Sequence, residues 1–535
     1  MAEVTQVSTP SAGSPGPVRQ DDRSWLRRPL EGEGRGGPIE RFMSALIRKL
    51  AWSRLSNPRV AVTVSGAGLL LGMLVGATAP NTETLPIRLP LSYPLPSLSH
   101  GTIENIVVSA MLYAGTILAC LGLAGMLWAH SQGWRPNPRH LLLVSTVIVA
   151  VMVCLTPVGS SDTGSYAAYG RIASQGGNPY ATSPAAWFGA HSLYYHVVGA
   201  LWKHQPSVYG PFATAIQSLA ASIGGPNAVV TIWVLMILNG AAFVGTGLLL
   251  LKTSDDPVRA TLFWTANPVL ILELVSGGHL DTFVAAAAIC SIQVARRVSG
   301  RWGDVLIGLL LGLACGIKVT AGLVAIGLAL PLLRRREWMR LARIAVVCLV
   351  MVAAQYSFYG LQSLKPLVAG TKLVTLPSPW WFFQITGELL GANKASMTTV
   401  ISILWPIAMF VIAFFIFRTI SSDQPREVVA PFALTFAWVI VAPWVFAWYT
   451  AIAWATLTLV PRNRMTRWLA IVTVFLALSH SSGGQVAGHP ILRDLGCHLT
   501  FCNQSMGPPG HVPWAHAGWR PGGHALTRSS AWYPT

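Results

Sequence analysis

The stretch VGSSDTGSYAAYGRIASQGGNPYAT, residues 158–182, holds a single carboxylate, Asp162, among serine, glycine and tyrosine residues. It follows directly on the apolar run 141–158. An acid at the end of a membrane helix, followed by an aromatic-bearing amphipathic segment, is typical of a general base directed at a substrate on the bilayer surface. The alternative interpretation is that residues 160–162 cap a helix that begins near Ser165.

The composition around this stretch is that of a membrane protein. Of the 535 residues, 53% are hydrophobic and only 10% are charged, and the mean hydropathy is +0.52. Repeated apolar runs of about twenty residues predict an all-α polytopic membrane protein. The net charge of +18 comes largely from clusters of Arg and Lys beside the apolar runs. Such clusters encode membrane topology, so nucleic acid is excluded as a partner.

Polar segments flank the apolar part of the chain. Residues 1–55 are rich in Pro, Gly, Ser and Arg and show no cleavable signal peptide, so we expect a disordered basic cytoplasmic tail. Residues 481–535 form a second tail, rich in Gly, Pro and His, which we expect to be external. Its two cysteines, Cys497 and Cys502, are compatible with a disulfide or with free thiols. Its histidines lack regular spacing, so no metal site is expected.

The predicted transmembrane domain covers residues 56–480. Positive charges before the first span, at about 60–79, place the N-terminus in the cytoplasm. With further spans at about 106–128 and 141–157, Asp162 reaches the extracytoplasmic face. Residues 158–210 are too polar to span and are predicted to form an external catalytic loop. The alternation of aromatic and polar residues in this loop predicts two interfacial helices, at 165–175 and 185–203.

The apolar piece at 212–225 is short for a span and is predicted to be re-entrant, which keeps the later Arg clusters in the cytoplasm. The run 304–333 is too long for one span, so we predict two half-length helices hinged at residues 316–318. A second external loop is expected at 361–395. Together the predicted count is about 11–13 transmembrane helices, with the remaining spans at about 228–251, 260–276, 282–298, 342–360, 396–417, 428–443, 446–460 and 467–480.

Few carboxylates are placed where they can act on a substrate. Eliminating those in tails, cytoplasmic turns and isolated loop positions leaves Asp162 and Asp281, both predicted at the external face. Asp281 follows His279 closely, and the two side chains form a polar pair able to hold a hydroxyl or phosphate; the alternative is a turn with an N-cap. Glu273 lies within a span and is either functional or a paired structural carboxyl.

Lys318 is isolated in an apolar stretch of about thirty residues. A charge there is costly unless it faces a cavity or an anion, so we predict contact with a phosphate; the alternative is that the side chain snorkels to the interface. Arg171 and Lys372 are further cations predicted on the external side.

With these residues assembled, the chain resembles the GT-C glycosyltransferases. It is most similar to the actinobacterial polyprenyl-phosphomannose-dependent α-(1→6)-mannosyltransferases of lipomannan and lipoarabinomannan synthesis. Where that family usually has an aromatic or bulky residue, this chain has Gly164. The blocks that carry the resemblance are SSDTGSYAAYGRIASQGGNPYATSP (160–184), VYGPF (208–212), NPVLILELVSGGHLDTF (267–283), GIKVTAGL (316–323), TKLVTLPSP (371–379) and WYTAIAW (448–454).

The resemblance implies an inverting mannosyltransferase in the plasma membrane, with an extracytoplasmic active site and the GT-C fold. It implies that Asp162 is the catalytic base, that His279 faces the substrate and that Lys318 contacts the donor phosphate. The expected donor is a polyprenyl-phosphate sugar, the expected acceptor is a mannan or lipoglycan, and no cofactor is expected. Further substrate-binding residues are expected in or beside the matching blocks, namely Tyr166, Arg171, Tyr209, Asp281 and Lys372.

Two other functions remain open from the sequence. A glycolipid transporter or flippase also needs many spans and buried charges, although it usually shows internal repeats with paired broken helices, which this sequence lacks. An inactive GT-C relative that acts as a scaffold is the third possibility. The sugar, the acceptor and the linkage do not follow from the residues alone.

Overall fold

The computed structural model describes residues 55–93, 95–98, 102–366, 373–420, 425–481 and 484–485. Both predicted tails lie largely outside these ranges, as do Cys497 and Cys502. The described residues belong to one unit that begins at Leu55. They are mostly helical, and their one sheet is a two-residue antiparallel pair, β1 (His480–Ser481) with β2 (Gly484–Gln485).

Six helical segments in the described part of the chain are long and apolar enough to cross a membrane. This confirms the predicted all-α polytopic membrane architecture; the orientation of the termini stays a prediction. Five of the segments coincide with α3 (Pro58–Ala77), α4 (Thr102–Ser131), α10 (Ala228–Thr253), α16 (Trp338–Tyr359) and α19 (Lys394–Thr419).

The sixth long segment, Pro257–Ser276, is not a regular helix. It consists of α11 (Pro257–Phe263), α12 (Pro268–Leu270) and the π-helical turn η4 (Ile271–Ser276). Pro268 has no backbone N–H and cannot continue α11, so the side chain of Asn267 caps a new helix by accepting from the N–H groups of Val269 and Leu270. A π-helical turn within a helix is frequent at functional sites.

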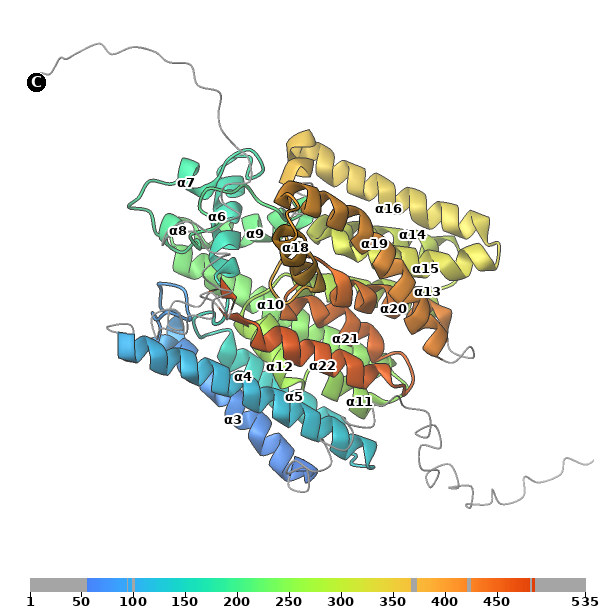
Figure 1. Ribbon diagram of the computed structural model, residues 1–535, viewed down its shortest axis with the longest axis horizontal. Helices are drawn as coiled ribbons and strands as arrows, with labels where there is room; N and C mark the ends of the chain where they lie inside the picture. The colour runs from blue at the N-terminus through green and yellow to red at the C-terminus, as the bar shows by residue number, and fades with distance from the viewer. Residues whose placement is uncertain are drawn as a thin grey trace, which may run out of the picture. The chain divides into compact units, whose positions relative to one another are not determined.

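Two groups of packed helices can be followed in Figure 1. In one group α3 packs against α4, and α5 (Pro138–Met152) lies nearby. In the other, α14 (Arg301–Ile317) packs against α16, and α15 (Gly322–Arg334) packs against α20 (Arg426–Val441). Helix α13 (Asp281–Arg297) belongs with the second group and contacts α14, α10 and α21 (Ala451–Leu457). The last helix, α22 (Met465–Leu478), packs against α4.

The loop after α5 contains one substantial helix, α6 (Asp162–Ser174), close to the predicted interfacial helix. The second predicted interfacial helix, 185–203, is wrong. Its place is taken by two single turns, α7 (Pro184–Trp187) and α8 (Leu193–His196). Gly189 and Gly199 lower the helix propensity of this segment. The short apolar piece that follows is α9 (Pro211–Gly224), whose 14 residues are too few for a perpendicular crossing.

The predicted hinge in the long apolar run is confirmed. Helix α14 ends at Ile317, Lys318 has an extended backbone (φ −150°, ψ 127°), and the turn η5 (Val319–Ala321) leads into α15. The hinge is fastened to the start of α9, because the Gly210 N–H donates to the Ile317 carbonyl at 3.0 Å. A Cβ at Gly210 would lie 2.3 Å from the Gly316 carbonyl oxygen, so only glycine permits this approach.

Short elements complete the fold. The expected loop 361–395 contains a helix that the sequence analysis missed, α18 (Pro379–Leu389), whose Ser378 hydroxyl accepts from the Trp380 N–H. The span predicted at 446–460 is shorter than expected, because its first turn is the 3₁₀-helix η7 (Ala447–Thr450) and α21 ends at Leu457. The other 3₁₀ turns are η3 (Pro90–Ser92) and η6 (Leu361–Leu364).

Candidate active site

The carboxylate of Asp162 lies at the first turn of α6 and is held by two tyrosines. Tyr166, one helical turn later, donates its hydroxyl to Oδ2 at 3.3 Å. Tyr209, from the segment just before α9, donates to the same oxygen at 3.4 Å. The two rings meet edge to face, with centroids 4.9 Å apart. The side chain of Asp162 remains 18% exposed, so a small reactant can reach it.

The third partner of Asp162 is His279. Its Nδ1 lies 3.5 Å from Oδ2 of Asp162, and its side chain is only 1% exposed. The imidazole stacks on the indole of Trp448, with centroids 3.8 Å apart and planes 11° from parallel. The backbone at this position is also fixed, because the Asn239 side-chain amide donates to the His279 carbonyl at 2.6 Å. The ring therefore has little freedom to leave Asp162.

The two interpretations of Asp162 apply to different atoms. The capping of α6 is provided by Ser160, whose hydroxyl accepts from the Asp162 N–H at 3.1 Å, while Ser161 makes no side-chain cap bond. The described partners of the Asp162 carboxylate are Tyr166, Tyr209 and His279 rather than backbone N–H groups of α6. The carboxylate thus points into a polar cluster built from three separate segments.

A second charged pair lies next to this cluster. The ammonium of Lys318 contacts both carboxylate oxygens of Asp281, at 2.9 and 3.1 Å. It also sits over the ring of Tyr449, 3.6 Å from the centroid. The Lys318 side chain is 15% exposed and that of Asp281 6%. The ammonium is therefore held inside the protein by a carboxylate and an aromatic face, rather than by water.

The expected pairing of His279 with Asp281 is not what the structure shows. His279 faces Asp162, whereas Asp281 faces Lys318. Asp281 is the first residue of α13 and makes no side-chain cap bond there. His279 and Asp281 are thus close in sequence but belong to two different pairs, which lie next to each other. Each pair joins segments that are far apart in the chain.

The electrostatic surroundings keep Asp162 ionised. Burial would raise the pKa of this carboxyl, but the bond and charge of His279, with the charge of Lys318, lower the pKa below its usual value. Burial raises the pKa values of Tyr166 and Tyr209 well above the ordinary range, and the charge of Asp162 raises them further. Both phenols therefore remain protonated and donate to the carboxylate.

The other predicted site residues are less clearly placed. Arg171 lies on α6, two to three turns beyond Asp162, and its charge acts on Tyr194 instead of the carboxylate. Lys372 lies outside the described residues. The block that contains it continues as Thr375, whose hydroxyl donates to the Pro443 carbonyl at 3.2 Å, so this block is tied to the segment before η7.

Three residues of the site carried little signal in the sequence. In the sequence, Trp448 and Tyr449 look like members of an aromatic belt at the membrane interface, although both belong to the block 448–454 that carries the family resemblance. His480 is a single histidine after the last apolar run, yet the centroid of its ring lies 5.2 Å from that of Trp448. Burial lowers the pKa of His480 to about 4, so the ring is neutral at pH 7. Within the part of the chain that the structure describes, no group of three or more His, Cys, Asp or Glu side chains is arranged to hold a metal ion.

Comparisons with known proteins show which family the chain belongs to. Residues 62–334, just over half of the chain, match the family described as "Alpha-(1->6)-mannopyranosyltransferase, N-terminal domain". The matched part contains Asp162, Tyr209, His279, Asp281 and Lys318. No solved structure matches the chain.

Two characterised relatives show how far the similarity extends. Alpha-(1->6)-mannopyranosyltransferase B of Corynebacterium glutamicum is 26% identical over 377 residues, which cover 67% of this chain and 60% of the relative. Alpha-(1->6)-mannopyranosyltransferase A of Mycobacterium tuberculosis is 26% identical over 296 residues, covering 51% of this chain and 54% of the relative. The matches therefore span less than two thirds of these relatives' own lengths. The extent of the family match shows that the chain belongs to the alpha-(1->6)-mannopyranosyltransferase family.

Proposed function

We propose that the protein is an inverting glycosyltransferase that moves mannose from a polyprenyl-phosphate donor to a mannan or lipoglycan acceptor at the external face of the cell membrane. The observation that carries the proposal is the partly exposed carboxylate of Asp162, held by Tyr166, Tyr209 and His279. Membership of the mannopyranosyltransferase family and the multi-pass architecture support the choice of sugar and of a lipid-linked donor.

Asp162 acts as the general base in this mechanism. Its carboxylate accepts the proton of the acceptor hydroxyl while the hydroxyl oxygen forms the new bond to the anomeric carbon. The anomeric carbon–oxygen bond breaks, and its electron pair leaves with the prenyl phosphate. A single in-line displacement inverts the anomeric centre, so one carboxylate is sufficient and no second carboxylate nucleophile is needed.

Lys318 stabilises the phosphate that departs. A phosphodiester oxygen leaves without protonation, but the growing negative charge needs a fixed cation. Asp281 and Tyr449 hold the Lys318 ammonium in one position, and this preorganisation is what electrostatic stabilisation requires. Lys372 and Arg171 are proposed as additional contacts to the donor.

Transfer itself is the direct test. Membranes that contain the protein are incubated with radiolabelled polyprenyl-phosphomannose and short α-mannosides, and the products are separated. The proposal predicts labelled oligosaccharides one mannose longer, formed by the wild type and not by Asp162→Asn. Label that moves across the bilayer without a new glycosidic bond would indicate a transporter. If a folded protein neither formed the new glycosidic bond nor moved label across the bilayer, it would be an inactive relative.

A further inference from the structure

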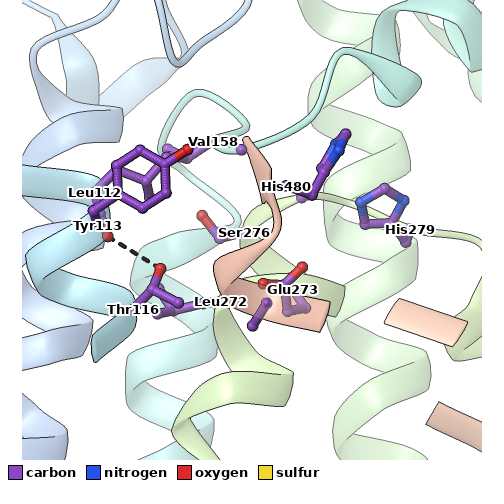
Figure 2. A pocket seen from close by; sticks show the side chains of 12 residues that line it. Leu112, Tyr113, Thr116, Val158, Leu272, Glu273, Ser276, His279 and His480 are labelled. Atoms are coloured by element: carbon purple, nitrogen blue, oxygen red, sulfur yellow. Dashed lines mark hydrogen bonds between the residues drawn. The ribbon is translucent and has the colours of Figure 1, made fainter. Parts of the chain in front are cut away.

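A small cavity adjoins His279, the partner of Asp162. Its volume is about 30 Å³, enough for one or two water molecules. In Figure 2, residues of α4 line one side, His279 and His480 line the other, and Glu273 and Ser276 lie between them. The lining residues are Leu112, Tyr113, Thr116, Val158, Gly159, Leu272, Glu273, Ser276, Gly277, His279, Ala477 and His480.

Glu273 is the unexplained residue in this cavity. It lies in the π-helical turn η4, within an apolar segment, where an ionisable group is costly. Among the described residues, no Lys, Arg or His lies within ion-pair distance of its carboxyl group. The alternative interpretation, in which Glu273 is a structural carboxyl paired with a cation, is therefore not supported by the described residues. The side chain lines the cavity instead.

His279 connects the cavity to the base. One ring nitrogen, Nδ1, faces Asp162, and the ring also lines the cavity. The other nitrogen, Nε2, lies over Gly277, where an added Cβ would be 2.8 Å from it and 2.7 Å from the Glu273 carbonyl oxygen. The imidazole thus contacts Asp162 through Nδ1, and its Nε2 lies beside Gly277, which also lines the cavity.

The reaction leaves a proton that must depart. The acceptor O–H proton stays on Asp162 after the glycosidic bond forms, while the prenyl phosphate leaves with the electron pair of the broken bond. A phosphate monoester with a second pKa of about 6 is mostly dianionic at neutral pH and does not retain that proton. Asp162 must therefore lose one proton per turnover before it can act again.

We propose that Glu273 is a proton-relay residue for this step. Asp162 passes its proton to His279, and His279 releases a proton to water in the cavity. The Glu273 carboxyl group gives a proton to solvent and takes up the one from the cavity water. No bond to carbon or phosphorus changes, and no oxidant or reductant is needed. The inference rests on the proposed function, because it assigns a route to the proton that the transfer reaction produces.

Other titratable groups around Glu273 do not replace it in this role. Tyr113 lines the cavity from α4, and Cys120 lies further along the same helix. A phenol and a thiol are much weaker acids than a carboxyl group, so neither is suited to relay a proton at neutral pH. His480, on the segment after α22, is neutral at pH 7 and lines the cavity with a side chain that is able to form hydrogen bonds. Glu83 acts electrostatically on His480 from the loop after α3, but it is committed to the Ser109 hydroxyl.

The test compares the first turnover with later ones. Purified wild type, Glu273→Gln and Glu273→Asp are mixed with labelled donor and acceptor in lipid nanodiscs, and product is followed from milliseconds to minutes. For Glu273→Gln we expect a burst of about one product per enzyme at a rate near that of the wild type, followed by turnover slowed about tenfold or more. The slow phase should rise about tenfold per pH unit, because hydroxide then removes the proton. Glu273→Asp should recover much of the loss.

Thr116→Val is the matched control. Thr116 lines the same cavity, but its hydroxyl already donates to the Leu112 carbonyl at 3.0 Å, so its removal should leave both phases and their pH dependence unchanged. If Glu273→Gln kept the steady-state turnover rate of the wild type, the relay would be overturned. It would also be overturned if the burst rate and the slow turnover rate fell by the same factor. Absence of transfer by the wild type would instead reject the proposed function.

Discussion

Nδ1 of His279 lies 3.5 Å from Oδ2 of Asp162, although the two residues are 117 positions apart in the chain (279 − 162). The pair forms because η4 and the turn at residues 277–280 bring the imidazole to the first turn of α6. The Thr163 hydroxyl fastens this junction by donating to the Gly277 carbonyl at 2.9 Å. The Val158 N–H also donates to the Ser276 carbonyl at 3.1 Å, so the base and its partner are positioned where these two segments meet.

His279→Asn should move the acid limb of the activity profile to higher pH. A base works only when deprotonated, so activity is present above the pKa of Asp162 and is lost as the pH falls through it. Burial raises that pKa and His279 is the largest influence lowering it, so removal of the imidazole raises the pKa. The measurement is kcat/KM against pH. His140→Asn, at an exposed position, should leave the limb unchanged, and an unmoved limb in His279→Asn would contradict the assignment.

Lys318→Met should cost both stability and donor use, for separable reasons. It leaves Asp281 buried without its cation, which typically costs about 3–5 kcal/mol of unfolding free energy. It also removes the cation that the mechanism places at the donor phosphate. In the double variant Lys318→Met with Asp281→Leu, much of the stability should return while the donor KM stays raised.

Unfolding in detergent and initial rates at varied donor concentration measure the two effects. A double variant that used the donor as well as the wild type does would show that the pair is only structural.

Gly164→Ala should disturb the site through packing. A Cβ at this position would lie 2.0 Å from the Val197 carbonyl oxygen, and a backbone atom cannot rotate away. Helix α6 would have to shift, two residues from Asp162, so we expect a loss of about 1–3 kcal/mol in unfolding free energy together with reduced transfer. Gly189→Ala, where the added Cβ meets nothing within 4 Å, is the control. Equal stability of the two variants would refute the packing argument.

The same contact explains why this chain has glycine at position 164. The structure shows that the Val197 carbonyl occupies the space that a side chain would need. Close approach between two backbones leaves no periodic signal, so this feature was not predictable from the residues.

Sequence reasoning was most effective where a charge interrupts an apolar run. Asp162 and Lys318 both stand out in this way, and the hinge at Lys318 follows from the length of the run around it. The pairing was not predictable, because His279 and Asp281 are close in sequence yet contact different partners after the chain turns at Gly278, with φ of +67°. His480 gave no signal, since one histidine after an apolar run is unremarkable until Trp448 is placed beside it.

The most direct measurement is the transfer rate of Asp162→Asn against that of Asp255→Asn, in membranes with matched amounts of each protein. Asn keeps the shape of the carboxylate and removes its capacity to accept a proton, and Asp255 is an exposed carboxylate outside the site. We predict a fall of about 10²–10⁴-fold for Asp162→Asn and an unchanged rate for Asp255→Asn. Comparable rates for the two variants would contradict the assignment of Asp162 as the base.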